Sequence, residues 1–289
     1  MTMLMLAERT VAGVGRLTLP GADGLAPHRG GALPLAPSAE PPPGSAAAHA
    51  RHRWYLGHQA AFCVWVLLAG QLRAIASRPD AAGEAVPAAA GLLDAYSVLL
   101  LYSGSCGSEI YQNVLRPEMA AAHHAFSGTW ARDYRPIPGL LRQLRATVPG
   151  RALAPHARAN LEAHIAVGEH LVPGRESLLR AAGRRRGEGV SAAEHDLFDE
   201  FFLVWRAPVT TADLAAQLST RLTDVAADIV AVTLPLIGTP AVQRLGRDAA
   251  EILVRSTVPV RPRTDSERST RGGEQVSPAS RAMRVCARW

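Results

Sequence analysis

The sequence contains no lysine, few aromatic residues and only three cysteines. Aromatic residues make up 5% of the 289 residues, whereas 48% are hydrophobic. This balance favours alanine- and leucine-rich helices joined by Pro/Gly loops over a β-rich chain. Cys63, Cys106 and Cys286 are too few and too scattered for a disulfide framework or a cysteine-based zinc site. The composition therefore predicts an all-α protein, and the small number of cysteines predicts a location in the reducing cytoplasm.

Arginine supplies all 31 basic residues, and the formal net charge is +6. Several arginines lie in the segments RPRTDSERSTR and RRR, which are typical of solvated loops rather than of an aromatic-interleaved nucleic-acid surface. No basic N-terminal region precedes a long apolar stretch, and no run of about 18 uninterrupted apolar residues occurs. We therefore expect no nucleic-acid partner and no membrane anchor.

Composition divides the chain into three parts. Residues 1–48 are rich in Gly, Pro and Ala and predict an N-terminal arm without core elements, long enough to drape over a second copy and so to hint at a homodimer. Residues 49–256 predict a helical domain, and 257–289 predict a disordered tail. Hydrophobic periodicity and breaker residues predict a short helix closed by Arg116-Pro117 and longer helices at about 50–77, 87–102, 136–147, 155–171, 191–205 and 210–233.

The first long helix carries a histidine on its apolar face. His58, Phe62 and Trp65 are spaced i, i+4 and i+7, so all three point inward. In isolation, an inward histidine is more often a hydrogen-bonded core residue than a catalytic one. The pattern therefore leaves both interpretations open.

A second histidine begins the helix predicted from 191. Ser191 and Glu194 form an S-x-x-E capping box. On one face of this helix the spacing predicts an aromatic wall with an imidazole at its start, made by His195, Phe198, Phe202 and Trp205. The alternative is a core helix with one satisfied histidine.

Several catalytic motifs are missing. The sequence has no H-E-x-x-H, no 2-His-1-carboxylate pattern, no G-x-S-x-G and no strand-borne G-x-G-x-x-G, which argues against a zinc hydrolase, a di-iron bundle, a serine hydrolase and a dinucleotide enzyme. A haem with one axial and one distal histidine would need only His58, His195 and a mostly apolar pocket.

Several segments resemble known haem enzymes. YLGHQAAFCVWVLLAGQLRAI is similar to the first core helix of tryptophan dioxygenases. LLDAYSVLLLYSGSCGSEIYQNVLRPEM, HHAFSGTWARDYRPIPGLLR and HDLFDEFF resemble the bacterial haem-dependent tyrosine hydroxylases of antibiotic pathways. Together these segments cover roughly half of the predicted helical domain.

The resemblance implies a helical bundle around a haem pocket, and hydroxylation of L-tyrosine to L-DOPA with hydrogen peroxide. It makes His195 the axial ligand and His58 the distal acid and base. Some relatives attach haem through a cysteine four residues after the axial histidine. Asp199 occupies that position here, so we expect haem b to be held non-covalently. The remaining expected haem contacts are Phe62, Trp65, Phe198, Phe202 and Arg116.

The substrate needs partners for its carboxylate and ammonium groups. The carboxylate-binding arginine of the dioxygenases has no counterpart in LLDAYSVLLLY, so their contacts cannot be transferred. The segment FSGTWARDY and the turn near residue 103 supply the expected substrate residues Ser103, Ser127, Trp130, Arg132 and Asp133. A surface ion pair between Arg132 and Asp133 is the structural alternative.

Two other functions remain open. One is a haem-dependent dioxygenase or hydroxylase acting on another aromatic amino acid, such as tryptophan or methyltyrosine. The other is a non-catalytic helical binding protein with structural histidines.

Overall fold

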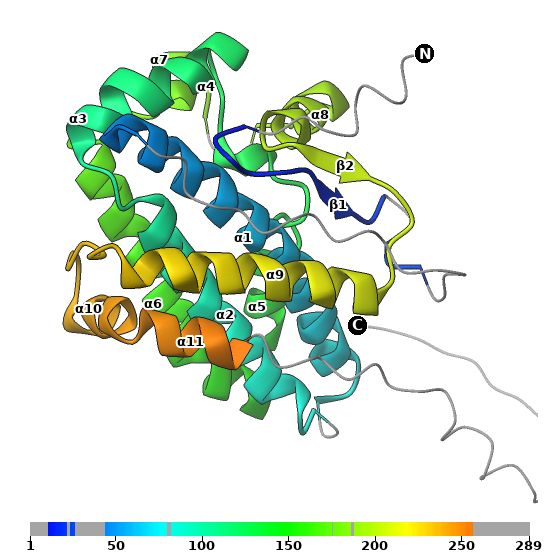
Figure 1. Cartoon of the computed structure of the whole chain (residues 1–289). Helices are drawn as coiled ribbons and strands as arrows, with labels where there is room; N and C mark the ends of the chain where they lie inside the picture. Colours follow the sequence, from blue (N-terminus) through cyan, green and yellow to red (C-terminus); the bar gives the residue numbers. More distant parts are fainter. Residues whose placement is uncertain are drawn as a thin grey trace, which may run out of the picture.

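The computed structural model describes residues 11–21, 24–26, 44–79, 82–174, 176–185 and 188–256. The chain is mostly helical, which confirms the predicted all-α fold (Figure 1). Its elements are, in chain order, β1 (Leu17–Leu19), α1 (Ala46–Ser77), α2 (Ala85–Ser103), α3 (Ser108–Ile110), η2 (Tyr111–Leu115), α4 (Arg116–Ala122), η3 (Gly128–Trp130), α5 (Ile137–Leu144), α6 (Val148–Leu171), α7 (Leu178–Ala181), α8 (Ala192–Phe201), β2 (Val204–Arg206), α9 (Thr211–Val230), α10 (Pro240–Arg247) and α11 (Ala249–Ser256).

Helices α1 and α2 form the centre of the bundle. The α6 helix packs on α2, and α9 lies across α1 (Figure 1). A Cβ atom at Gly57 would lie 2.2 Å from the Ser103 hydroxyl, so glycine permits the close approach of α1 to α2 beside His58. Both helices are also long and apolar enough to cross a membrane, but 61% of each apolar stretch is buried within the fold.

The helix after residue 107 does not close at Arg116-Pro117, contrary to the prediction. It passes through the π-helical turn η2, in which the Arg116 amide donates to the Tyr111 carbonyl, and continues as α4 to Ala122. Pro117 lies in the first turn of α4, where its missing N–H is tolerated. The π turn absorbs the change in hydrogen-bond register.

The helix predicted over 191–205 ends earlier. Helix α8 stops at Phe201, because Leu203 adopts a positive φ of 57° and the chain then extends as β2. Trp205 therefore leaves the aromatic wall. Trp205 is 46% exposed, and the Arg16 guanidinium lies over its ring, 5.3 Å from the ring centroid.

Part of the N-terminal arm belongs to the core, which the composition did not predict. Strand β1 pairs in parallel with β2, Leu17 opposite Val204, and the side chains of Val14, Leu17 and Leu19 are fully buried. Helix α1 also begins at Ala46, inside the predicted arm. Residues 1–10 and 27–43 of the arm and the tail 257–289 lie outside the described residues, so the division into domains stays a prediction.

Buried polar side chains fasten this arm to the bundle. The Gln59 amide donates to the carbonyls of Gly15 and Phe202, each at 2.9 Å, and its oxygen accepts from Arg221 Nε at 2.9 Å. Gln217 on α9 exchanges two hydrogen bonds with the backbone of Thr18. Gln59 thus joins the arm to the end of α8 and to α9.

Helices α10 and α11 were not predicted. Thr239 caps α10 by accepting from the Val242 amide at 3.4 Å, and α11 packs against α2 and α9. The buried side chains of Val242, Ile252 and Leu253 close that side of the core.

Replacing Gln59 by leucine should lower the free energy of unfolding by about 2–4 kcal/mol, because two buried carbonyls and a buried guanidinium lose a partner. Urea unfolding of the full chain measures the loss. Gln112→Leu is the matched control, since the Leu171 carbonyl that Gln112 contacts keeps its bond from Ser108. Equal losses in the two variants would contradict the role given to Gln59.

Candidate functional site

His58 lies on α1 with one ring nitrogen fixed. Its Nδ1 is 2.6 Å from the Trp54 carbonyl oxygen. A carbonyl can only accept, so Nδ1 carries the proton and Nε2 presents a lone pair. Among the described residues no group hydrogen-bonds to that Nε2. The imidazole is thus oriented to accept a proton or a metal at Nε2.

The surroundings of His58 are apolar. Its ring stacks on Phe202 with centroids 4.3 Å apart and planes 10° apart, and Trp54 lies 4.4 Å away. Burial lowers the pKa of His58 to about 4, although the bond to the Trp54 carbonyl opposes this shift. His58 is therefore a neutral imidazole at neutral pH.

His195 repeats this arrangement at the start of α8. The predicted capping box is present, with Ser191 and Glu194 each bonded to the other's backbone amide. The Nδ1 of His195 is 2.5 Å from the carbonyl oxygen of Trp130, a residue of η3. By the same reasoning Nδ1 carries the proton and Nε2 has a free lone pair, the form in which histidine binds a metal.

A chain of aromatic contacts runs from His58 to Trp130, the residue whose backbone carbonyl contacts His195. Beyond Phe202, successive ring centroids are 5.0 Å apart to Phe198, 5.4 Å to Phe126 and 5.6 Å to Trp130. Phe62 contacts Phe202 at 5.9 Å, and Trp65 contacts Phe62 at 5.2 Å. The two phenylalanines of the predicted wall, Phe198 and Phe202, therefore form one cluster with His58, and His195 is connected to it through the Trp130 backbone.

Trp54 and Phe126 belong to the site but were not predicted. Trp54 lies one turn before His58, a spacing that the sequence does show. Phe126 comes from the irregular segment after α4, where no periodicity indicated the direction of its ring.

Three indole groups in the cluster have buried N–H donors. The Nε1 atoms of Trp54, Trp65 and Trp130 have no hydrogen-bond partner among the described residues. An unpaired buried donor costs roughly 1–3 kcal/mol, and an acceptor on a ligand or an ordered water would remove this cost. Two imidazoles with free Nε2, an aromatic wall and buried donors fit a haem, which needs only one or two protein ligands. Within the described ranges, no group of three or more His, Cys, Asp or Glu residues could hold a bare metal ion.

The other histidines have different partners. The Nδ1 of His123 accepts from the Ala125 amide at 3.0 Å, so the proton of its neutral ring lies on Nε2. His52 is fully buried on α1 and bound to the Ala12 carbonyl, and His156 on α6 is 2.8 Å from Asp94.

The predicted substrate residues fall into separate environments. Ser127 caps η3, and Ser103 is buried against Gly57. Arg132 and Asp133 do not form the surface pair considered above, because each has other partners. Arg116 donates to the Glu176 carbonyl at 2.8 Å. Binding by these residues stays a prediction.

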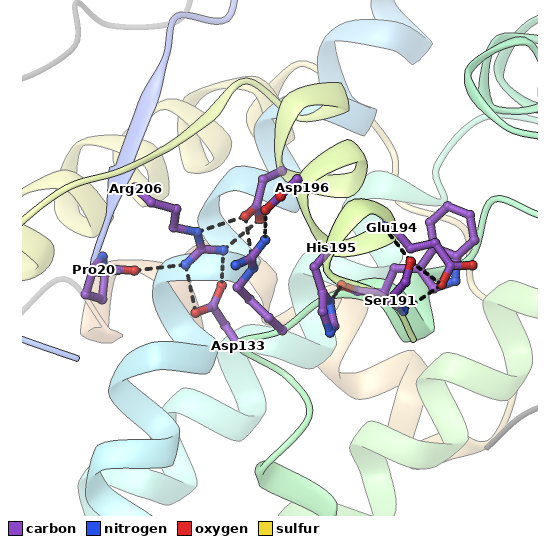
Figure 2. A network of polar contacts seen from close by, with 10 residues as sticks. Pro20, Asp133, Ser191, Glu194, His195, Asp196 and Arg206 are labelled. Atoms are coloured by element: carbon purple, nitrogen blue, oxygen red, sulfur yellow. Dashed lines mark hydrogen bonds and ion pairs between the residues drawn. The ribbon is translucent and has the colours of Figure 1, made fainter. Parts of the chain in front are cut away.

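A network of charges lies beside His195 (Figure 2). Arg206 on β2 makes two bonds to Asp133, at 2.8 and 3.0 Å, and two to Asp199, at 2.7 and 2.9 Å. Arg132 contacts Asp196 at 2.5 Å and Asp199 at 3.1 Å. Sequence reasoning missed Arg206 because nothing in the order of residues pairs it with Asp133.

The fold and the two imidazoles are typical of a helical haem enzyme. Residues 7–166 match the family model described as SfmD 3-methyl-L-tyrosine peroxygenase. The match covers more than half of the chain, so the chain belongs to this peroxygenase family. It includes His58 and Trp130 but ends before His195. A search of the curated proteins found no match.

In the haem-free protein, His58 should remain neutral until the pH falls to about 4, below the usual pKa of 6.5. The unfolded chain takes up this proton first, so His58 makes stability decrease as the pH falls from 6.5 toward about 4. A nitrogen-15 NMR titration of labelled histidines measures the pKa, and His58→Ala identifies the signal. Titration of that signal near 6.5 would contradict the burial argument.

Proposed function

We propose that this chain is a haem-dependent peroxygenase that hydroxylates the ring of 3-methyl-L-tyrosine or a closely similar amino acid. The observation that carries the proposal is the shared geometry of His58 and His195. In each, a tryptophan carbonyl fixes Nδ1 as the donor and leaves Nε2 without a partner among the described residues. Both of these tryptophans, Trp54 and Trp130, belong to the aromatic cluster. Membership of the peroxygenase family supports the same reaction class.

His195 is the residue that would hold the iron. The Trp130 carbonyl keeps its proton on Nδ1 and makes Nε2 a better electron donor. The porphyrin would pack against the side chains of Phe62, Trp65, Phe198 and Phe202. Arg116 would form an ion pair with a haem propionate. Asp199 has no thiol that could form a thioether, so the haem b would be held without a covalent bond.

Bound haem supplies the oxidising chemistry, and the chain supplies position and proton transfer. His58 is neutral at neutral pH, so its Nε2 can accept a proton from the peroxide or from the substrate phenol and later return it. In the net reaction one ring C–H becomes C–OH while hydrogen peroxide becomes water. In a 3-methylated tyrosine, only one carbon next to the phenol is free to react.

The predicted set Ser103, Ser127, Trp130, Arg132 and Asp133 remains our proposal for the substrate. Within it, the buried Nε1 of Trp130 has no partner among the described residues and could donate to a carboxylate. To bind the charged groups of the substrate, Arg132 and Asp133 would have to contact them in addition to their present partners, Asp196 and Arg206.

L-Tyrosine is the second candidate substrate, because the segments around His58, Trp130 and His195 resemble tyrosine hydroxylases. The product would then be L-DOPA. The cytoplasm is the proposed compartment, since Cys63 and Cys106 are both buried free thiols.

His195→Ala should abolish the haem absorption band of the reconstituted protein, because the proposed iron ligand is removed. His123→Ala is the matched control, since His123 packs 5.0 Å from the same Trp130 ring but holds its proton on Nε2. It should bind haem as the unsubstituted protein does. Normal haem binding by His195→Ala would overturn the assignment, as would the lack of any haem band in the unsubstituted protein.

The haem-loaded enzyme with hydrogen peroxide should hydroxylate 3-methyl-L-tyrosine with a higher kcat/KM than L-tyrosine, as measured by chromatography of the products. His58→Gln should keep the haem band and lose about 10²–10⁴-fold in kcat, the usual contribution of a positioned acid or base. A preference for L-tyrosine would select the second candidate. Formation of neither product, with haem bound, would reject both.

A further inference from the structure

The charges beside His195 form a largely buried cluster. Asp199, Asp133 and Arg206 have side chains that are 7%, 11% and 17% exposed, whereas Asp196 at the edge is 73% exposed. Burial by itself would lower the pKa of Arg206, but its hydrogen bonds to Asp199 and Asp133 outweigh that effect and raise it. Arg206 is therefore a permanent cation between two carboxylates.

This cluster connects segments far apart in the chain. Asp133 follows η3, Asp199 lies on α8 and Arg206 lies on β2. Arg206 also donates to the Pro20 carbonyl at 3.2 Å, just after β1 (Figure 2). One guanidinium thus holds the N-terminal arm, the segment after η3 and α8 at a fixed separation.

Stability alone does not explain such a cluster. Replacing buried ion pairs by apolar residues of similar volume is often neutral or stabilising, because burying charges carries a large desolvation penalty. The planar, bidentate contacts of arginine instead impose a defined geometry. The function of the cluster is therefore to hold neighbouring groups in a fixed position.

The hydrogen bond of His195 spans two of the same segments. Trp130, whose carbonyl accepts the Nδ1 proton, lies three residues before Asp133, and His195 lies one helical turn before Asp199. Arg206 bridges Asp133 and Asp199, so it sets the distance across which the Trp130–His195 bond is made.

We propose that Asp133, Asp199 and Arg206 are positioning residues that keep His195 in its Nδ1–H form, with Nε2 free for iron. The part that concerns iron rests on the proposed function, while the tautomer can be measured without haem. If the Trp130 carbonyl were not held beside Nδ1, the neutral His195 ring would exchange between its Nδ1–H and Nε2–H tautomers.

The test compares the buried and exposed ends of the cluster in the full-length chain. Asp199→Asn removes the carboxylate shared by Arg206 and Arg132, and Asp196→Asn removes only the exposed contact of Arg132. Nitrogen-15 NMR of labelled histidines in the haem-free protein reports the tautomer, with the His195 signal identified by its loss in His195→Ala. Haem titration then gives the affinity.

The unsubstituted protein and Asp196→Asn should show only the Nδ1–H form. Asp199→Asn should show both forms and bind haem about 10–100-fold more weakly, the usual effect of losing support for a metal ligand. Arg206→Lys keeps the charge but not the paired contacts, so it should resemble Asp199→Asn. Circular dichroism confirms that each variant is folded.

An unchanged tautomer in folded Asp199→Asn and Arg206→Lys would overturn the proposal. Loss of folding in both variants would also overturn it, because the cluster would then be a stability element. If the unsubstituted protein binds no haem, the proposed function fails, but the tautomer still decides whether the cluster positions His195.

Discussion

The hydrogen bond between His195 Nδ1 and the Trp130 carbonyl is the constraint on which the candidate site depends. It joins a short 3₁₀ turn to the first turn of α8 and decides which ring nitrogen is free. The capping box fixes where α8 begins, and Phe202, just after the end of α8, stacks on His58. Without this bond His195 would be a partly buried histidine with no defined ligand atom.

His58 shows the same principle within a single helix. Its Nδ1 bonds to a carbonyl four residues earlier, so local backbone geometry is sufficient to orient it. Its low pKa arises from the Trp54 and Phe202 rings, which exclude water from the charged form. The two histidines thus have the same tautomer for different reasons, one local and one tertiary.

The difference between local and tertiary contacts explains which parts of the site could be predicted from the sequence. Helical phase correctly predicted the inward face of His58, Phe62 and Trp65, and the capping box predicted the start of α8, because both are short-range effects. The end of α8 depends on Leu203 entering a positive φ and on β2 finding β1, and neither follows from periodicity. The contacts of Arg206 with Asp133 and of His195 with Trp130 cross 73 and 65 residues, beyond the reach of any local pattern.

The pairing of β1 with β2 also has a consequence for the order of folding. The Pro20 carbonyl and Arg206, which bond beside these strands, are separated by 186 residues. Because the arm precedes its partners β2 and α9 in the chain, it can dock only after both have been synthesised. Contacts this distant in sequence form slowly, since the loop between them must close first. The arm therefore docks late in folding, and the geometry around α8 is completed only when β1 pairs with β2.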